Sequence, residues 1–297
     1  MPIKSHCDGF LRLFVTGKKG KKMVVGIVGL GLMGGSLGLA LQNTKFITKI
    51  LGFDHNLNHC EEALKLGLVH DIASFSEIKQ CDVVFLAIPV GGIIKALQEM
   101  KDVASTTTII DLGSTKAEIV AAVPESIRSN FIAAHPMTGT EKFGPSAAIQ
   151  NLYHDKVVVL CDTNSSDDLH KNRAIQIFSH IGMKIVFMDP VAHDAHASFI
   201  SHLPHVISYA LANSVMGQED PKSILSLAAG GFKDMSRIAK SSPQMWADIF
   251  KQNRENVLHS IEIFEKELEK SKQMIENEEW ENLENWMSKA TTLHKIL

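Results

Sequence analysis

Residues 24–34 read Val-Val-Gly-Ile-Val-Gly-Leu-Gly-Leu-Met-Gly, an apolar run that ends in the pattern Gly29-x-Gly31-x-x-Gly34. The run predicts a buried strand, and residues 33–42 have the composition of a helix. In this context Gly29 allows a tight turn, Gly31 lets a pyrophosphate approach the backbone, and Gly34 lets the helix pack on its strand. The first amides of the helix then face the phosphates, so this segment predicts a dinucleotide-binding site.

A carboxylate follows the next apolar run. Residues 47–53 predict a second strand, and Asp54 stands 20 residues after Gly34. A carboxylate at this place accepts hydrogen bonds from an adenosine ribose and repels a 2′-phosphate. The next residue is His55 and not arginine, so NAD is expected rather than NADP; a solvated turn aspartate is the alternative. The residues expected to contact the cofactor are Gly29, Gly31, Leu32, Met33, Gly34, Asp54, Pro89 and Ser114.

The 20 residues 24–43 carry no charge and are long enough on paper to cross a bilayer. Five glycines between positions 29 and 38 would weaken a membrane helix, so the strand, turn and helix are the better interpretation. A net charge of −3 over 297 residues provides no excess of positive charge for nucleic acid or an anionic membrane. Neither partner is expected.

The four cysteines are far apart and form no C-x-x-C pair. This pattern indicates neither a disulfide framework nor a thiolate zinc site, and it fits a reducing cytoplasm.

Apolar runs alternate with helical segments from residue 23 to about residue 186. Strands buried on both faces and separated by helices predict a mostly parallel, Rossmann-type sheet. Further strands are expected at residues 83–88, 106–112, 131–134 and 156–160.

From Asp189 onward the pattern is helical, and apolar residues spaced by three or four from Trp246 to Leu268 predict one long helix. The expected organisation is a flexible leader at 1–22, a dinucleotide-binding domain at 23–188 and an all-helical domain at 189–297. Whether Met1 or Met23 is the native start stays open.

Polar residues follow two of the predicted strands. Ser114 comes after the strand at 106–112, and His135 comes after the strand at 131–134. Ligands of open parallel sheets lie at the carboxyl ends of the strands. Oxidation of an alcohol needs a proton acceptor, for which neutral histidine is suited, and a serine can orient the hydroxyl. The alternatives are a structural histidine and a helix N-cap serine.

Four histidines, His193, His196, His202 and His205, lie within 13 residues. No H-E-x-x-H frame is present, and Pro204 would kink a helix between the second pair. No metal is expected, and the histidines are interpreted as substrate-facing or core residues.

The segment 230–237 joins two glycines to Lys233 and Arg237. An arginine fork suits a carboxylate ligand. A surface ion pair of Arg237 with Asp234 or Asp248 is the alternative.

Together the motifs resemble the prephenate dehydrogenase family over residues 23–270. They are G-L-G-L-M-G-G-S-L at 29–37, D-L-G-S-T-K at 111–116, H-P-M-T-G-T-E-K at 135–142, S-H-L-P-H at 201–205 and G-G-F-K-D-M-S-R-I-A-K-S-S-P-Q-M-W at 230–246.

The resemblance implies NAD-dependent oxidative decarboxylation of prephenate to 4-hydroxyphenylpyruvate, on the route to tyrosine, by an intertwined homodimer. His135 would accept the hydrogen bond of the ring hydroxyl, with Ser114 beside it near the nicotinamide. Arg237 would bind the ring carboxylate that leaves as carbon dioxide. The remaining substrate residues implied are His205, Ser201, Thr140, Glu141, Lys233 and Trp246, the last from either subunit.

With 22 residues in the leader, we expect no chorismate mutase domain of the kind that some relatives carry, and we expect no regulatory domain after the helical domain. Any feedback by tyrosine is therefore expected to act at the active site itself.

Three other functions stay open. Arogenate dehydrogenases share the fold and chemistry, although His205 and Lys233 would slightly repel the ammonium group of arogenate. A β-hydroxyacid dehydrogenase shares the glycine turn, but its expected catalytic lysine is missing from residues 191–218. A non-catalytic dinucleotide-sensing module would not need His135, Ser114 and Arg237 together.

Overall fold

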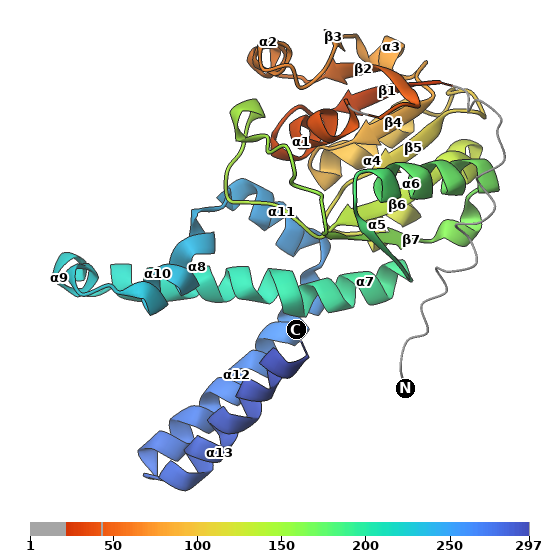
Figure 1. Ribbon diagram of the computed structural model, residues 1–297. Helices are drawn as coiled ribbons and strands as arrows, with labels where there is room; N and C mark the ends of the chain where they lie inside the picture. Colours follow the sequence, from red (N-terminus) through yellow and green to blue (C-terminus); the bar gives the residue numbers. More distant parts are fainter. Residues whose placement is uncertain (1–21, 43, 297) are drawn as a thin grey trace.

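The computed structural model describes residues 22–42 and 44–296, so the expected leader lies, except for Lys22, outside the described residues. Within the described part of the chain eight strands form one sheet, with the order β3-β2-β1-β4-β5-β6-β7-β8 (Figure 1). The strands are β1 (Met23–Val28), β2 (Ile47–Phe53), β3 (Asp71–Ile72), β4 (Val83–Leu86), β5 (Thr108–Asp111), β6 (Phe131–Pro136), β7 (Val157–Cys161) and β8 (Lys184–Met188).

The sheet is parallel except where β6 and β7 pair antiparallel. The connection at 137–156 contains only the short 3₁₀ turn η2 (Pro145–Ala147). No α-helix lies in this connection to carry the chain back across the sheet, and β7 runs antiparallel to β6. The prediction of a mostly parallel Rossmann-type sheet is confirmed.

Helices cover both faces of the sheet, as the fully apolar strands predict. In β4, Val83 and Phe85 belong to one core cluster, while Val84 and Leu86 belong to the other. The first cluster packs against α1, α2 and α6, and the second against α3, α4 and α5. These helices are α1 (Leu32–Leu41), α2 (Leu57–Lys65), α3 (Phe75–Ile78), α4 (Val90–Glu99), α5 (Ala117–Ala121) and α6 (Asp168–His180).

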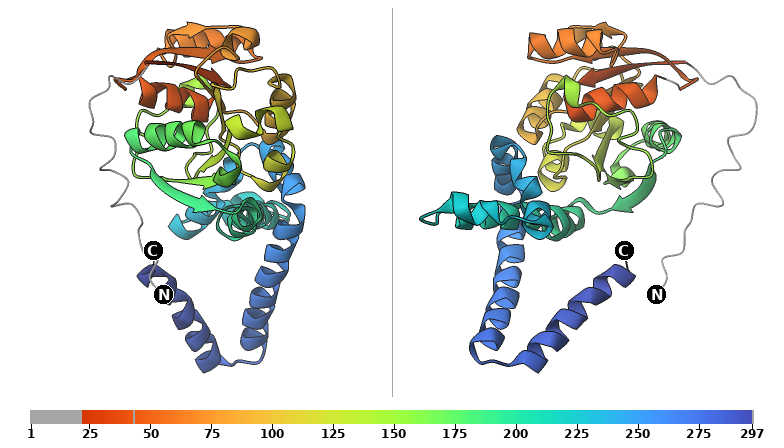
Figure 2. Two further views of the ribbon diagram at one scale, coloured as in Figure 1. Left: turned by 90° about the vertical axis from the view of Figure 1, so that its right-hand side faces the viewer. Right: turned by 60° about the vertical axis from the view of Figure 1, so that its left-hand side comes forward.

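Beyond β8 the described chain is helical. A rod made of α7 and α8 runs beneath the sheet, and α12 and α13 extend away from it as a V (Figures 1 and 2). The elements are α7 (Pro190–Ala197), η4 (Ser198–His202), α8 (Leu203–Met216), α9 (Pro221–Ser226), α10 (Gly230–Ser236), η5 (Arg237–Lys240), α11 (Pro243–Gln252), α12 (Arg254–Glu276), α13 (Trp280–Thr291) and η6 (Thr292–Lys295).

The prediction of one long helix from Trp246 to Leu268 is wrong, because the helix breaks at Asn253 between α11 and α12. The Asn253 amide nitrogen donates to the backbone oxygen of Asp194 at 2.7 Å and lies 3.1 Å from Nδ1 of His202. These hydrogen bonds hold the Asn253 side chain at the position where the helix is interrupted. The spacing of apolar residues does not reveal such contacts.

A π-helical turn, η4, separates α7 from α8, and Pro204 follows as the second residue of α8. Proline has no backbone N–H to donate to a helical hydrogen bond, and the π-helical turn ends two residues before Pro204. Among the described residues no helix combines the length and apolar character needed to cross a membrane.

Candidate active site

The glycine turn joins β1 to α1. Gly29 has φ +91°, and a Cβ atom there would lie 2.4 Å from the Ala87 carbonyl oxygen. A Cβ on Gly34 would lie 1.8 Å from the carbonyl oxygen of Gly29. At Gly31 a Cβ would have one neighbour within 4 Å, the backbone nitrogen of Gly144 at 3.9 Å. Two glycines are thus required by packing, while Gly31 borders open space.

No side chain caps the amino end of α1. Its first amides are therefore suited to an anionic group that approaches over Gly31. The residues present fit a dinucleotide pyrophosphate.

Asp54 lies directly after β2, beside this turn. Its carboxylate accepts hydrogen bonds from the backbone N–H groups of Leu30 and Asn56, both at 2.9 Å. His59 lies 3.4 Å from the same carboxylate. Oδ1, which accepts from Asn56, keeps a lone pair for a further donor, which is what a ribose hydroxyl provides.

The other expected cofactor residues lie around the same edge. Leu32 is buried, and the backbone oxygen of Met33 accepts a 2.7 Å hydrogen bond from the Tyr153 hydroxyl. Pro89 is exposed at the start of α4. Ser114 is half-buried, and its hydroxyl makes no hydrogen bond to any residue the structure describes.

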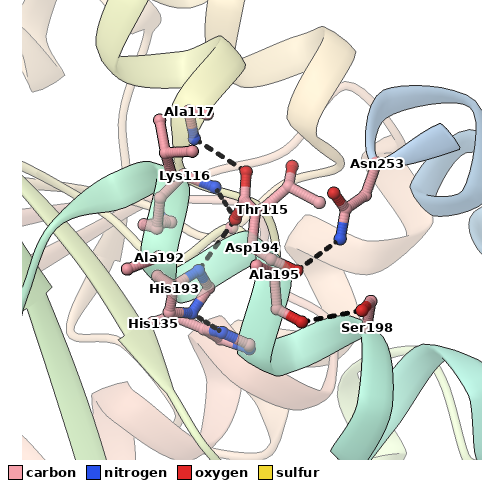
Figure 3. A network of polar contacts seen from close by, with 12 residues as sticks. Thr115, Lys116, Ala117, His135, Ala192, His193, Asp194, Ala195, Ser198 and Asn253 are labelled. Atoms are coloured by element: carbon pink, nitrogen blue, oxygen red, sulfur yellow. Dashed lines mark hydrogen bonds and ion pairs between the residues drawn. The ribbon is translucent and has the colours of Figure 1, made fainter. Parts of the chain in front are cut away.

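His135 lies inside β6, opposite Val159 of β7, and not beyond a strand ending at residue 134 as predicted. The antiparallel partner extends the strand past the histidine. The His135 Nδ1 atom is 2.8 Å from Nε2 of His193, which belongs to α7 (Figure 3). The two rings meet edge to face with their centroids 5.0 Å apart.

The surroundings of His135 hold its pKa well below the ordinary value of 6.5. Burial is the largest cause, followed by the positive charge that His193, Lys116 and His202 present or can acquire. His135 is therefore neutral near pH 7 and can accept a proton.

A buried ion pair lies beside His135. Lys116 and Asp111 are fully buried and in contact, and the Lys116 ammonium also donates to the Ala134 carbonyl oxygen at 2.7 Å. Asp111 accepts from the backbone N–H groups of Gly113 at 2.9 Å and Ala134 at 3.2 Å. The pair ties the end of β5 to β6, next to His135. Lys116 stands in a quoted motif, but sequence reasoning assigned it no role.

Helix α5 is capped from the helical part of the chain. The Asp194 carboxylate of α7 accepts from the backbone N–H groups of Lys116 at 2.7 Å and Ala117 at 2.9 Å (Figure 3). The alternative of Ser114 as the side-chain N-cap is therefore not observed. The adjacent Thr115 hydroxyl donates to the Gln252 side chain of α11 at 2.9 Å, which also joins the two parts.

His205 and Trp246 are stacked, with ring centroids 3.5 Å apart and an interplanar angle of 22°. The His205 Nδ1–H donates to the Ser201 carbonyl oxygen at 2.9 Å, so Nε2 is its acceptor atom. Burial is the main cause that lowers the pKa of His205. The His202 ring also meets Trp246, edge to face, with the two ring centroids 6.0 Å apart.

Arg237 is exposed and lies 3.7 Å from the carboxylate of Glu141, not beside Asp234 or Asp248. The Thr140 hydroxyl, next to Glu141, accepts from the backbone N–H of Lys142 at 3.2 Å. A line of contacts thus runs from His135 through His193, Asp194, Asn253, His202 and Trp246 to His205. Arg237 and Glu141 form a separate pair, and the Arg237 charge helps to lower the pKa of His205.

Lys233 lies exposed on α10, and no contact between described residues connects it to this line. Within the described residues no three His, Cys, Asp or Glu side chains are arranged to hold a metal ion.

The chain matches two family models. The prephenate dehydrogenase nucleotide-binding domain matches residues 37–187, and the prephenate dehydrogenase dimerization domain matches residues 189–289. Prephenate dehydrogenase of Bacillus subtilis is 32% identical over 271 residues, which are 89% of this chain and 73% of that protein.

Two solved structures are similar over nearly the whole chain. Prephenate dehydrogenase from Aquifex aeolicus, in complex with hydroxyphenyl propionate and NAD+, has a TM-score of 0.87 and 32% identity, covering 94% of this chain and 99% of that one. Synechocystis arogenate dehydrogenase has a TM-score of 0.77 and 27% identity, and the match covers 92% of this chain and 99% of that one. The sequence motifs, the fold and these matches agree, and the chain belongs to the prephenate dehydrogenase family.

Proposed function

We propose that the protein catalyses the NAD-dependent oxidative decarboxylation of prephenate to 4-hydroxyphenylpyruvate, a step toward tyrosine. The observation that carries this proposal is His135, a neutral histidine at the carboxyl end of β6 in a chain of this family. The Aquifex aeolicus relative holds NAD+ together with a hydroxyphenyl compound, which supports the same pairing of cofactor and ligand here.

NAD+ would be held at the glycine turn, with the pyrophosphate over Gly31 at the amino end of α1 and a ribose at Asp54. Leu32, Met33, Pro89 and Ser114 would complete the site. The bound cofactor supplies the acceptor for the hydride that leaves the substrate.

His135 would take the proton of the ring hydroxyl while the hydride leaves the same ring carbon, so that the C–O bond becomes a carbonyl. The bond from the ring to its carboxylate then breaks, carbon dioxide leaves, and the electron pair restores an aromatic ring. The proton returns from His135 to the phenolate oxygen, so the histidine is regenerated. Ser114 would orient the hydroxyl.

The remaining substrate contacts are proposed at the residues that the family resemblance implies. Of these, His205 and Trp246 are stacked, Arg237 pairs with Glu141, and Lys233 lies apart on α10. Arg237 would bind the ring carboxylate, and His205 and Ser201 would line the pyruvyl side. Thr140, Glu141, Lys233 and Trp246 would form the rest of the pocket.

The direct test is the appearance of NADH absorbance at 340 nm when the purified protein receives NAD+ and prephenate. We expect turnover that His135→Asn reduces by about 10²–10⁴-fold, the usual contribution of a positioned acid–base group. No NADH with prephenate from a protein that binds NAD+ would refute the proposal.

Arogenate is the second candidate substrate, because an arogenate dehydrogenase is among the similar structures. The cationic Lys233 of the proposed pocket favours the uncharged keto group of prephenate over an ammonium group, whereas His205, whose pKa is lowered by burial, adds no positive charge at pH 7. We therefore expect a higher kcat/KM with prephenate, and a higher value with arogenate would reverse the assignment.

We also propose a dinucleotide-binding domain at 23–188 and a substrate and dimerisation domain at 189–297 that forms a homodimer. An apolar groove of about 340 Å³ between α8, α11 and α12, lined by residues that include Val206, Phe250 and Leu258, supports a paired helical surface. Sedimentation equilibrium is expected to give twice the chain mass.

Tyrosine is proposed to inhibit at the active site, because it shares the hydroxyphenyl side chain of the product. Inhibition competitive with prephenate is expected, and a purely noncompetitive pattern would contradict it.

Cys60, Cys81 and Cys161 are free and buried, which agrees with the cytoplasmic location expected from cysteine spacing.

A further inference from the structure

Two neighbouring residues of α7 have no part in the proposed substrate contacts, yet they complete a hydrogen-bonded chain to His135. The Nδ1 atom of His135 lies 2.8 Å from Nε2 of His193. The Nδ1 atom of His193 lies 2.8 Å from the Asp194 carboxylate. His193 and Asp194 are both buried (Figure 3).

The direction of this chain follows from Asp194. Its carboxylate accepts hydrogen bonds from the backbone N–H groups of Lys116 and Ala117 at the amino end of α5, and this position favours a negative charge. An ionised carboxylate accepts hydrogen bonds and donates none. The hydrogen in the bond to Asp194 therefore belongs to Nδ1 of His193.

A neutral histidine that carries its hydrogen on Nδ1 has a lone pair on Nε2. The bond between the two rings is then donated by Nδ1 of His135 and accepted by Nε2 of His193. His135 in turn keeps its own lone pair on Nε2, the atom on the far side of the ring from His193.

We propose that His193 and Asp194 are positioning residues that hold His135 in the Nδ1–H tautomer, with Nε2 as the acceptor for the substrate hydroxyl. This inference rests on the proposed role of His135 as the proton acceptor. The alternative tautomer would turn an N–H toward the hydroxyl, and His135 could not take its proton.

The same chain stabilises the protonated state. When the hydroxyl proton moves to Nε2 of His135, the Nδ1–H of His135 stays bonded to His193. The negative charge of Asp194, on the far side of the His193 ring, then stabilises the positive charge of His135. The other charged or titratable groups around His135 are Lys116, which is paired with Asp111, and His202 of η4. Burial lowers the pKa of His202 to about 4, so it is neutral at pH 7.

Asp194 has a second effect, because its carboxylate also caps α5, the helix that follows the Ser114 loop. One side chain of α7 therefore sets both the orientation of His135 and the start of the segment after Ser114.

The first test uses the full protein without substrate. Nitrogen-15 NMR of histidine-labelled protein at pH 7.5 distinguishes Nδ1–H from Nε2–H imidazoles, and His135→Asn identifies the His135 signals by their absence. We expect His135 to be the Nδ1–H tautomer. An Nε2–H signal would overturn the inference, whatever the substrate is.

The second test compares two variants at position 193. Glutamine has a carbonyl oxygen that can accept from His135 and an amide that can donate to Asp194, whereas phenylalanine keeps a planar ring without either. We expect kcat within about 10-fold of the natural protein for His193→Gln and a loss of about 10²-fold or more for His193→Phe, with KM for NAD+ unchanged in both.

Equal losses in the two variants, or a fully active His193→Phe, would overturn the positioning role, because a packing role depends on shape and not on polarity. Nδ1–H signals retained in His193→Gln and lost in His193→Phe would support it. An Nδ1–H tautomer in a protein that does not turn over prephenate would refute the proposed function while the tautomer assignment stands.

Discussion

The guanidinium of Arg237 lies 3.7 Å from the carboxylate of Glu141, so η5 of the helical part meets the connection between β6 and β7. Six residues before Glu141 stands His135, in the same segment of chain. The pair is partly exposed, and an ion pair of this kind contributes about 0–1 kcal/mol to stability. The Arg237–Glu141 pair therefore contributes little to folding, and we expect Arg237 to act in substrate binding.

Arg237→Gln is expected to raise KM for prephenate. A charge-assisted hydrogen bond to a carboxylate is worth about 1.5–3 kcal/mol, which corresponds to a rise of about 10–150-fold. Steady-state kinetics at saturating NAD+ measure the effect, and KM for NAD+ is the internal control.

Glu141→Gln provides a matched comparison, since it removes the partner and leaves the guanidinium in place. Glu141 belongs to the same proposed pocket, but a carboxylate cannot bind the substrate carboxylates by charge, so we expect a smaller change in KM for prephenate than in Arg237→Gln. An unchanged KM in Arg237→Gln would remove this arginine from the substrate site.

His135→Asn is expected to lower kcat by about 10²–10⁴-fold with little change in the affinity for NAD+. Asparagine keeps a polar side chain but has no group that accepts a proton near pH 7. Quenching of protein fluorescence by NAD+ measures cofactor binding separately from turnover. If kcat stays within a few-fold, another residue accepts the proton.

The pH dependence follows from the lowered pKa of His135. Since only the neutral ring accepts a proton, kcat/KM falls as the pH drops through that pKa. Burial, then the charges of His193, Lys116 and His202, place it well below 6.5. We expect kcat/KM for prephenate to stay level from pH 7 down to pH 6 and to fall only at lower pH, after a control for acid inactivation. An acid limb centred at or above about pH 6.5 would contradict this environment.

The parts of the fold that were predictable are those whose signals are local. The glycine turn and the strand at 47–53 are each recognisable within a few residues, and the structure contains both. The uncharged stretch 24–43 contains all of β1 except Met23 and all of α1, as interpreted.

What sequence reasoning missed depends on partners far along the chain. The break at Asn253 arises from contacts with Asp194 and His202, more than 50 residues away. The contact of His193 with His135 spans 58 residues. His193 belongs to the histidine cluster at 193–205, but spacing alone cannot tell which of these rings faces the sheet.

Asp54 determines the choice of cofactor in the next prediction. Asp54→Ser is expected to raise KM for NAD+ and to permit use of NADP+, because the carboxylate that repels a 2′-phosphate is gone. Asp54→Asn is the control that keeps an acceptor for the Leu30 N–H and removes the charge. The ratio of kcat/KM for the two cofactors reports the change. A ratio that neither substitution alters would show that Asp54 does not contact the ribose.

Lys116→Met is expected to destabilise the protein strongly, because Asp111 would remain buried without its cation. Removing one partner of a buried ion pair costs about 3–5 kcal/mol. The backbone N–H groups of Gly113 and Ala134 would still bond to Asp111, but they cannot neutralise it. The double substitution Asp111→Asn with Lys116→Met removes both charges, and an asparagine oxygen can still accept from these amides. We therefore expect the double variant to be more stable than Lys116→Met alone in urea unfolding at a fixed protein concentration. Equal decreases in the free energy of unfolding would show that the packing of the lysine side chain, and not the unpaired Asp111 charge, determines the destabilisation.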